Sequence, residues 1–373
     1  MRIAIITQPL RTNYGGILQN YALHTVLKRM GHTTTTLQQN ELKKPGYLRY
    51  CITLAKRLFM KICGKYKYPL LYERTYYRDF PVFTQHTLGF VRRHIKMEFL
   101  DYVHPNLSPE SFDAYVVGSD QVWRPLYNNI DFTFLSFAKG WNVKRCAYAV
   151  SFGTNKWEFS KEQTATCREL AGLFDEISVR ETSGIELCSK YLDITAEQVL
   201  DPTLLLQRSD YEHLIEDFST VKSKGDLLVH ILDKSTDKNK LVEIISQGNN
   251  LKPFEVNCEV DEHEVNEPIE KRIQPPVEQW LRAFMDTKFV VTDSFHATVF
   301  SLIFNKPFIV YINEARGAAR FQSLLSIFGL DDRIVHKSED FDMTTLFDID
   351  FNEVNQKIEK LRKKSIDFLK KEF

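Results

Sequence analysis

Short apolar runs that end in polar, loop-forming residues recur along the first half of the chain. Each run is rich in β-branched, aromatic or small residues and is bounded by glycine, aspartate or serine, which is typical of a buried strand. The predicted strands lie at 2–7, 33–37, 113–117, 145–151, 176–180 and 198–203. Apolar strands that close in polar loops predict a parallel sheet whose carboxyl edge carries functional residues.

The first two strands and the segment between them predict a βαβ unit. Apolar residues at helical spacing indicate a helix at 18–30, which Gly31 ends. Residues 13–16, Asn-Tyr-Gly-Gly, form the loop before this helix. They do not match GxGxxG, and no acidic residue follows at the spacing of a ribose contact. Phosphate binding and a plain strand-to-helix turn both remain open for this loop.

A second α/β set follows, beginning with a strand at 226–232. Helices are predicted at 240–247 and 276–287. A further βαβ unit combines a strand at 289–292, a helix at 296–304 and a strand at 308–312. The helix of this unit ends at Asn305-Lys306-Pro307, because proline cannot continue it.

These elements predict an α/β protein of two Rossmann-like domains that face each other across a cleft. The expected parts are an N-terminal domain at 1–205, a linker at 206–225 and a C-terminal domain at 226–345. A C-terminal helix within 346–373 is expected to pack back on the N-terminal domain. A ligand in the cleft contacts both domains, and closure of the cleft excludes water.

Size and composition agree with a two-domain protein, since the chain has 373 residues. The 49 basic and 49 acidic residues cancel, so no overall field favours nucleic acid. Six scattered cysteines without a CxxC pair favour a reduced compartment. The start reads as a strand rather than a signal peptide, and no apolar run reaches the roughly 20 residues of a membrane span. A cytoplasmic protein is predicted.

The segment 43–80 differs from the rest because it carries ten basic residues against Glu73 and Asp79. Within it, 48–62 has the pattern of a basic amphipathic helix. Such a helix can lie on an anionic membrane surface, where each nearby charge adds about 1 kcal/mol. A solvated insertion packed on its domain is the open alternative. Nucleic-acid binding is a poorer account, because nothing else in the chain is basic.

His296 is the most informative residue, because it lies where a predicted buried strand meets a helix. Ligands bind at this carboxyl edge in open α/β sheets. The start of the helix also offers free N–H groups and a positive dipole end, which suit a carboxylate or phosphate. Asp293, Ser294 and Thr298 surround the histidine in sequence. The prediction is an anion site at which His296 donates a proton.

Two other strand ends carry charged residues that suit the same site. Arg180 has the fork that holds a carboxylate or phosphate, although an ion pair with Glu181 or a buried structural role is the alternative. Asp120 is either a general base or a loop or helix cap. His230, inside a strand, is expected to be a core histidine. No pair of histidines or cysteines has metal-ligand spacing in a suitable context.

Several motifs, taken in order, resemble the polysaccharide pyruvyl transferase family over roughly residues 1–325. They are Asn13-Tyr-Gly-Gly-Ile-Leu-Gln-Asn-Tyr-Ala-Leu23, Val117-Gly-Ser-Asp-Gln-Val-Trp123, Tyr148-Ala-Val-Ser-Phe-Gly153, Ser178-Val-Arg-Glu181, Val199-Leu-Asp-Pro-Thr203 and Thr292-Asp-Ser-Phe-His-Ala-Thr298. Each motif is weak alone, whereas the ordered set is specific.

This resemblance implies a GT-B-like fold and transfer of a pyruvyl group from phosphoenolpyruvate to two hydroxyls of a sugar. The acceptor would belong to a surface polysaccharide or its lipid-linked precursor, and no metal or organic cofactor would be required. The composition of the basic segment 43–80, rather than the resemblance, suggests an acceptor linked to a lipid and a protein that works at the inner membrane face. His296 matches the histidine implicated in catalysis, and Arg180 matches an arginine of the Ser-Val-Arg-Glu motif.

One position departs from the family pattern. Better-known members carry arginine two residues before the motif histidine, where this chain has Ser294. Arg316, Arg320 or Lys306 is expected to supply the missing charge. The predicted site comprises His296 and Asp120 as catalytic residues, Arg180, Ser294, Thr298 and Arg320 for the donor, and Asn13, Asn20 and Gln121 for the acceptor.

The expected chemistry needs a charged His296 that protonates the methylene carbon of the donor. A nearby anion would raise the pKa of this histidine and favour the charged form. Asp120 would take a proton from an acceptor hydroxyl. Two other functions stay open: a GT-B glycosyltransferase that uses a nucleotide-sugar, and a non-catalytic binding protein of glycan assembly.

Overall fold

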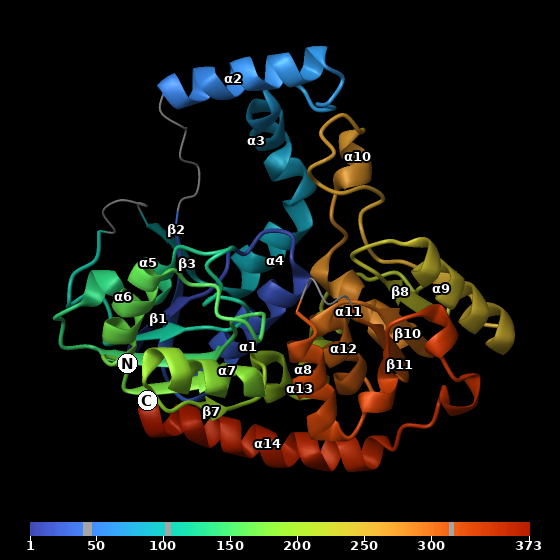
Figure 1. The fold of residues 1–373 in the computed structure, drawn as a ribbon. Coiled ribbons are helices and arrows are strands. Elements are labelled where there is room, and N and C mark those ends of the chain that lie inside the picture. The colour runs from blue at the N-terminus through green and yellow to red at the C-terminus, as the bar shows by residue number, and fades with distance from the viewer. Residues whose placement is uncertain (40–46, 101–105, 313–316) are drawn as a thin grey trace.

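The computed structural model describes residues 1–39, 47–100, 106–312 and 317–373. It contains two parallel β-sheets, each with helices packed against it (Figure 1). The first sheet belongs to the N-terminal part of the chain and the second to the C-terminal part. We call these parts the N-unit and the C-unit.

The N-unit sheet has seven strands in the order β3-β2-β1-β4-β5-β6-β7, and every pair is parallel. The strands are β1 (Arg2–Ile6), β2 (Thr33–Gln39), β3 (Met97–Leu100), β4 (Ala114–Val117), β5 (Lys144–Val150), β6 (Glu176–Val179) and β7 (Glu197–Gln198). The order reverses between β1 and β4, as it does in dinucleotide-binding sheets. The loops after these two strands therefore border a crevice.

The C-unit sheet has five parallel strands in the order β12-β11-β10-β8-β9. The strands are β8 (Leu227–His230), β9 (Pro253–Phe254), β10 (Phe289–Thr292), β11 (Phe308–Tyr311) and β12 (Ile334–Val335). Here the order reverses between β8 and β10. The predicted βαβ unit around His296 is present, with helix α12 (Phe295–Ile303) between β10 and β11.

Helix α1 (Tyr14–Arg29) begins four residues before the predicted start at residue 18. Asn13 causes the difference, because its side-chain oxygen accepts a hydrogen bond from the Gly16 backbone at 3.2 Å and caps the helix. Gly15 and Gly16 therefore lie in the first helical turn rather than in a loop.

The remaining helices cover the sheets or connect them. In the N-unit they are α4 (Gln85–His94), α5 (Ile130–Thr133), α6 (Lys161–Ala171) and α7 (Thr182–Leu187). The later ones are α8 (Arg208–Glu216), α9 (Thr236–Asn249), α10 (Ile269–Arg272), α11 (Val277–Asp286) and α13 (Ala319–Phe328). Helix α8 lies within the segment predicted as a linker, and its Tyr211 is fully buried.

One hydrophobic core runs through both units. It contains residues of β1 and α1 from the N-unit together with residues of α11 and α12 from the C-unit. Successive side chains of β1 point to opposite faces of the sheet. Ile3 and Ile5 therefore face this core, while Ala4 and Ile6 face a second hydrophobic cluster. Opening the units like a hinge would expose this apolar surface, so the interface holds them together.

Helix α14 (Phe351–Glu372) runs along both units and returns to the N-unit (Figure 1). The buried Arg362 donates hydrogen bonds to the carbonyls of Leu204 and Leu206 at 2.7 and 3.1 Å. The Ser365 hydroxyl accepts one from the Leu200 backbone at 3.0 Å. These contacts give the backbone that follows β7 its hydrogen-bond partners.

The basic segment forms two helices that project from the N-unit. Helix α2 (Tyr47–Ile62) lies apart from both sheets, and α3 (Tyr72–Phe83) leads from it toward the C-unit segment that carries α10 (Figure 1). Arg272 of α10 forms a buried ion pair with Asp79 of α3 at 2.8 Å. No helix in the described ranges has the length and apolar character needed to cross a bilayer.

Candidate active site

His296 lies in the first turn of α12, at the carboxyl end of β10. Ser294 caps the helix, because its hydroxyl accepts a hydrogen bond from the Ala297 backbone. Asp293 instead accepts bonds from the backbone of Leu232 and Asp233 at 2.6 and 3.0 Å. It thereby fixes the loop after β8 beside the histidine, which is a supporting role.

The His296 ring packs against the backbone of the opposite unit. A Cβ atom built on Gly15 would lie 2.1 Å from Cγ of His296, closer than any side chain allows. The N-unit therefore needs glycine at this position so that the imidazole can approach the first turn of α1. This contact accounts for Gly15 of the motif without a bound phosphate.

A buried ionic cluster lies beyond the histidine. Two nitrogens of Arg180 bind Asp201 and Asp120, at 2.9 and 3.0 Å. Nε2 of His296 lies 3.7 Å from the same oxygen of Asp201, and Arg320 lies 3.8 Å from Asp120. The structure thus brings four of the predicted residues together, and Asp201 links them.

The environment of Asp120 does not suit a general base. Burial alone would raise its pKa, but the positive charges of Arg180, His296 and Arg320 outweigh burial and lower the pKa to about 2. A carboxylate held this strongly in its ionised form accepts a proton poorly at neutral pH. The structure favours a supporting role, in which Asp120 orients the two guanidinium groups.

His296 also differs from the expectation, because its pKa is lowered in this unliganded structure. Burial favours the neutral ring, and the carboxylates of Asp201 and Asp120 only partly oppose that effect. Among described residues Nε2 has no hydrogen-bond partner, although the ring is buried. A neutral imidazole with one free nitrogen is ready to exchange a proton with a ligand.

Arg180 does not offer its fork to a ligand here, since two of its nitrogens bind carboxylates. This is the structural alternative that the sequence left open. Arg320 is the better candidate for an anion. Burial, and to a smaller extent the charge of Arg180, lowers the pKa of Arg320 to about 10. Both guanidinium groups lie over the Phe295 ring, at 4.3 and 5.7 Å.

The sequence offered two other candidates, Lys306 and Arg316, for the positive charge that replaces the missing arginine. Lys306 donates to the carbonyls of Met285 and Thr287 at 3.0 and 2.7 Å, beyond the carboxyl end of α12. The site is at the opposite end of that helix, so Lys306 does not reach it. Arg316 lies outside the described residues.

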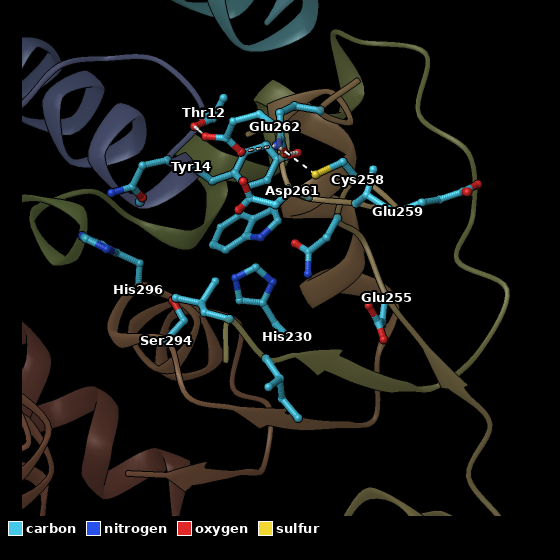
Figure 2. Close-up of a pocket in the computed structure, with 18 of the residues that line it drawn as sticks. Thr12, Tyr14, His230, Glu255, Cys258, Glu259, Asp261, Glu262, Ser294 and His296 are labelled. Atoms are coloured by element: carbon cyan, nitrogen blue, oxygen red, sulfur yellow. Dashed lines mark hydrogen bonds between the residues drawn. The ribbon is translucent and has the colours of Figure 1, made fainter. Parts of the chain in front are cut away.

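A cavity of about 570 Å³ opens next to His296 and is lined by both units. Figure 2 shows His230 among the lining residues near the centre and His296 at their edge. Ser294 and Asn13 also line this cavity. The N-unit contributes residues before and within the start of α1, and the C-unit contributes the end of β8 and much of 255–262.

Three predicted residues lie away from the cavity. Asn20 is buried within the N-unit and accepts a hydrogen bond from Thr36 at 2.9 Å. Gln121 accepts one from Arg124 at 3.2 Å in the loop after β4. The buried Thr298 hydroxyl donates to the Ser294 carbonyl at 3.0 Å. These contacts are structural, and the expected acceptor and donor roles do not follow from them.

The sequence reasoning missed His230 and Trp280, which both line the cavity. Nδ1 of His230 and Nε1 of Trp280 are buried without a hydrogen-bond partner in the described part of the chain. Burial lowers the pKa of His230 to about 4 and keeps the ring neutral. His230 could have been recognised as a candidate ligand-binding residue, because it ends a strand at the point where the strand order reverses.

Metal ligation finds no support in the ranges that the structure describes. They contain no group of three or more His, Cys, Asp or Glu side chains arranged to hold an ion.

The two facing parallel sheets and the cavity between them define a protein of the GT-B fold class. A UDP-GlcNAc 2-epimerase from Neisseria meningitidis is similar, with a TM-score of 0.51 and 10% identity over 98% of this chain and 94% of that one. UGT89C1 from Arabidopsis thaliana gives a TM-score of 0.51 and 8% identity over 99% and 98%. Such low identities show the fold alone.

The family follows from the sequence itself. A family model described as polysaccharide pyruvyl transferase matches residues 13–314, which is most of the chain. This protein belongs to that family, whose members are transferases. No curated protein sequence matches it.

The contact between Gly15 and His296 can be tested by stability alone. We expect Gly15→Ala to lower the free energy of unfolding by about 1–3 kcal/mol, because the added methyl group overpacks the interface. Gly16→Ala is the matched control, since its Cβ would meet nothing closer than 3.4 Å. That variant should be neutral or gain up to about 1 kcal/mol from helix propensity. Chemical denaturation measures both, and equal stabilities would contradict the contact.

Proposed function

We propose that this protein transfers a pyruvyl group from phosphoenolpyruvate to two hydroxyls of a sugar in a surface polysaccharide or its lipid-linked precursor. The observation that carries the proposal is the position of His296. His296 lines a cavity large enough for a sugar, and its Nε2, which has no hydrogen-bond partner among the described residues, faces Asp201 of the buried ionic cluster. Family membership supports the same reaction class.

The donor is strongly anionic and needs positive charge close to the histidine. Arg320 and the free N–H groups at the start of α12 would neutralise its carboxylate or phosphate. Arg180, Asp120 and Asp201 would keep Arg320 and His296 in place through the contacts described above. Ser294 would stay the cap of α12 in this scheme.

In the proposed reaction, His296 is the proton donor. Its imidazolium form protonates the methylene carbon of the donor, and one sugar oxygen attacks the carbon that bears the phosphate. Departure of phosphate and attack by the second oxygen complete the ketal. Each of the two hydroxyls releases one proton in these steps. One of these protons returns to His296, and the other protonates the departing phosphate.

The nucleotide-sugar alternative has less support from the cavity. Its lining includes four acidic residues, Glu255, Glu259, Asp261 and Glu262, against the single basic Lys234. A nucleoside diphosphate would meet repulsion there. The non-catalytic alternative predicts glycan binding without release of phosphate, which the following experiment distinguishes.

The proposed reaction is tested with labelled phosphoenolpyruvate and candidate lipid-linked oligosaccharides, followed by mass analysis of the product and a phosphate assay. We expect His296→Asn to lower turnover at least about 10²-fold, since a positioned proton donor contributes that much. His336→Asn, at an exposed position, is the control. Unchanged turnover in His296→Asn would remove this residue from the mechanism.

Donor binding should take up a proton. Burial keeps the pKa of His296 low in the free protein, and a bound anion raises it, so the ring gains charge on binding. Binding is therefore tighter at lower pH and weakens, by up to about tenfold per pH unit, as the pH rises toward the bound-state pKa. Titration calorimetry near pH 7 in buffers of different ionisation enthalpy measures the protons taken up. Equal uptake by wild type and His296→Asn would contradict this assignment.

We also propose that the protein acts at the inner membrane face, held there by α2. The outward face of this helix is apolar, with Ile52, Phe59 and Ile62 exposed by 61%, 68% and 77%. The opposite face turns toward the protein, where Arg57 pairs with Glu73. Such an orientation leaves the apolar face without a protein partner in the described structure.

Basic residues border this apolar face, which favours an anionic lipid surface as its partner. Lys56, Lys61 and Lys65 are exposed along or just after α2. An in-plane helix binds membranes through apolar burial together with attraction of such lysines to anionic headgroups. A lipid-linked acceptor would be found at the same surface.

Co-flotation with vesicles tests this placement. We expect binding to vesicles that contain anionic lipid, and a loss of at least about tenfold in Phe59→Ser/Ile62→Ser, because two apolar side chains leave the bilayer. Leu126→Ser/Val221→Ser, at equally exposed positions elsewhere, should bind like wild type. Binding that survives replacement of Lys56, Lys61 and Lys65 by glutamate would contradict the proposal.

A further inference from the structure

The cavity beside His296 has features that the proposed reaction leaves unassigned. It lies beyond the carboxyl ends of β8 and β10, where ligands bind in sheets of this kind. Tyr14 and Trp280 stack in its wall at 5.5 Å, and the His230 ring meets Trp280 edge-on at 5.6 Å. These packed rings give the cavity a largely apolar and rigid wall on this side, as is common in ligand sites.

Buried polar atoms in the same wall lack partners. Nε1 of Trp280 and Nδ1 of His230 form no hydrogen bond with the described residues, and both side chains are more than nine-tenths buried. Buried polar atoms are usually paired, so two such atoms in residues that line a cavity favour a ligand that would pair with them. An indole N–H can only donate, and a sugar hydroxyl can accept that bond.

The charged side chains that line the cavity indicate which kinds of ligand it can bind. Glu255 is neutralised by Lys234 at 3.0 Å. Within the described part of the chain, Glu259, Asp261 and Glu262 form no ion pair with a basic side chain. Arg272 lies behind them, donating to the backbone carbonyl of Glu262 while it pairs with Asp79. The cavity therefore attracts a cation and repels an anion.

We infer that this cavity is the acceptor site and that it prefers an amino sugar to a neutral sugar and a neutral sugar to an anionic one. The inference rests on the proposed function, for which it names the acceptor class. It also assigns most acceptor contacts to the C-unit, whereas the predicted acceptor residues Asn13, Asn20 and Gln121 all belong to the N-unit. The hydroxyls of a sugar held here would face His296 and Ser294 at the edge of the cavity.

The acidic wall is joined to the helix pair of the basic segment. Thr12 donates to Glu262 at 2.8 Å from the N-unit, and Tyr72 of α3 contacts His263 at 2.7 Å. Lys67, between α2 and α3, pairs with Glu264 at 2.6 Å. These contacts hold the segment after Glu259 against the loop between α2 and α3 and the start of α3.

Binding without donor tests the inference separately from transfer. Saturation-transfer NMR with wild-type protein and methyl glycosides of glucosamine, glucose and glucuronic acid gives the three dissociation constants. We expect the glucosaminide to bind at least about tenfold more tightly than the glucuronide, with the glucoside between them. Glu259→Gln/Glu262→Gln should reduce this ratio at least about threefold. Glu243→Gln, exposed on α9, should leave the ratio unchanged.

A second variant addresses the unpaired nitrogen. His230→Phe keeps a planar aromatic ring, one atom larger, and removes both nitrogens, so it should weaken binding of all three glycosides while preserving their order. Equal or tighter binding of the glucuronide in wild type, or an unchanged ratio in the double glutamine variant, would overturn the inference. A protein that binds the glucosaminide as expected but makes no ketal would refute only the proposed function.

Discussion

The buried ion pairs of Arg180 with Asp120 and Asp201 are the interaction on which the site depends. A buried guanidinium is costly unless carboxylates and hydrogen bonds surround it, and removing one partner leaves an uncompensated charge. These pairs join the loop after β4, the end of β6 and the turn after β7 into one rigid group. Because Asp201 also lies near His296, the balance of charge in the N-unit influences the protonation of a histidine from the C-unit.

The position of the two units relative to each other is also constrained by close packing. A shared apolar core joins them, and His296 fits only because Gly15 has no side chain. A second close approach lies nearby, where a Cβ on Gly317 would fall 1.9 Å from the carbonyl oxygen of Gly153. Catalytic groups held by packed elements of this kind keep their geometry better than groups on free loops. The proposed chemistry therefore relies on a preformed interface, and proton and charge changes occur within it.

The projecting helices connect the outer surface with the cavity beside His296. Helix α2 presents apolar side chains outward, and α3 contacts the C-unit segment that forms the acidic wall. A sugar carried on a lipid would need both features, one for the lipid surface and one for the glycan. On the proposals above, the guanidinium groups of Arg180 and Arg320 near Phe295 and the acidic cavity would bind an anionic donor and a neutral or cationic acceptor at different places.

The sequence by itself determined most of the strands and their order, because strand and helix periodicities and their glycine, proline and serine boundaries are local properties. It also placed His296 and Arg180 at strand ends, and the ordered motifs led to the family. It did not indicate the edge strands β3, β9 and β12. Only the tertiary structure decided that Arg180 is internally paired, that Asp120 is a poor base, and that His230 and Trp280 border a cavity. Each of these depends on distant segments sharing one buried volume, where desolvation and neighbouring charges set protonation and pairing. The local sequence does not show which distant residues become neighbours in the folded chain.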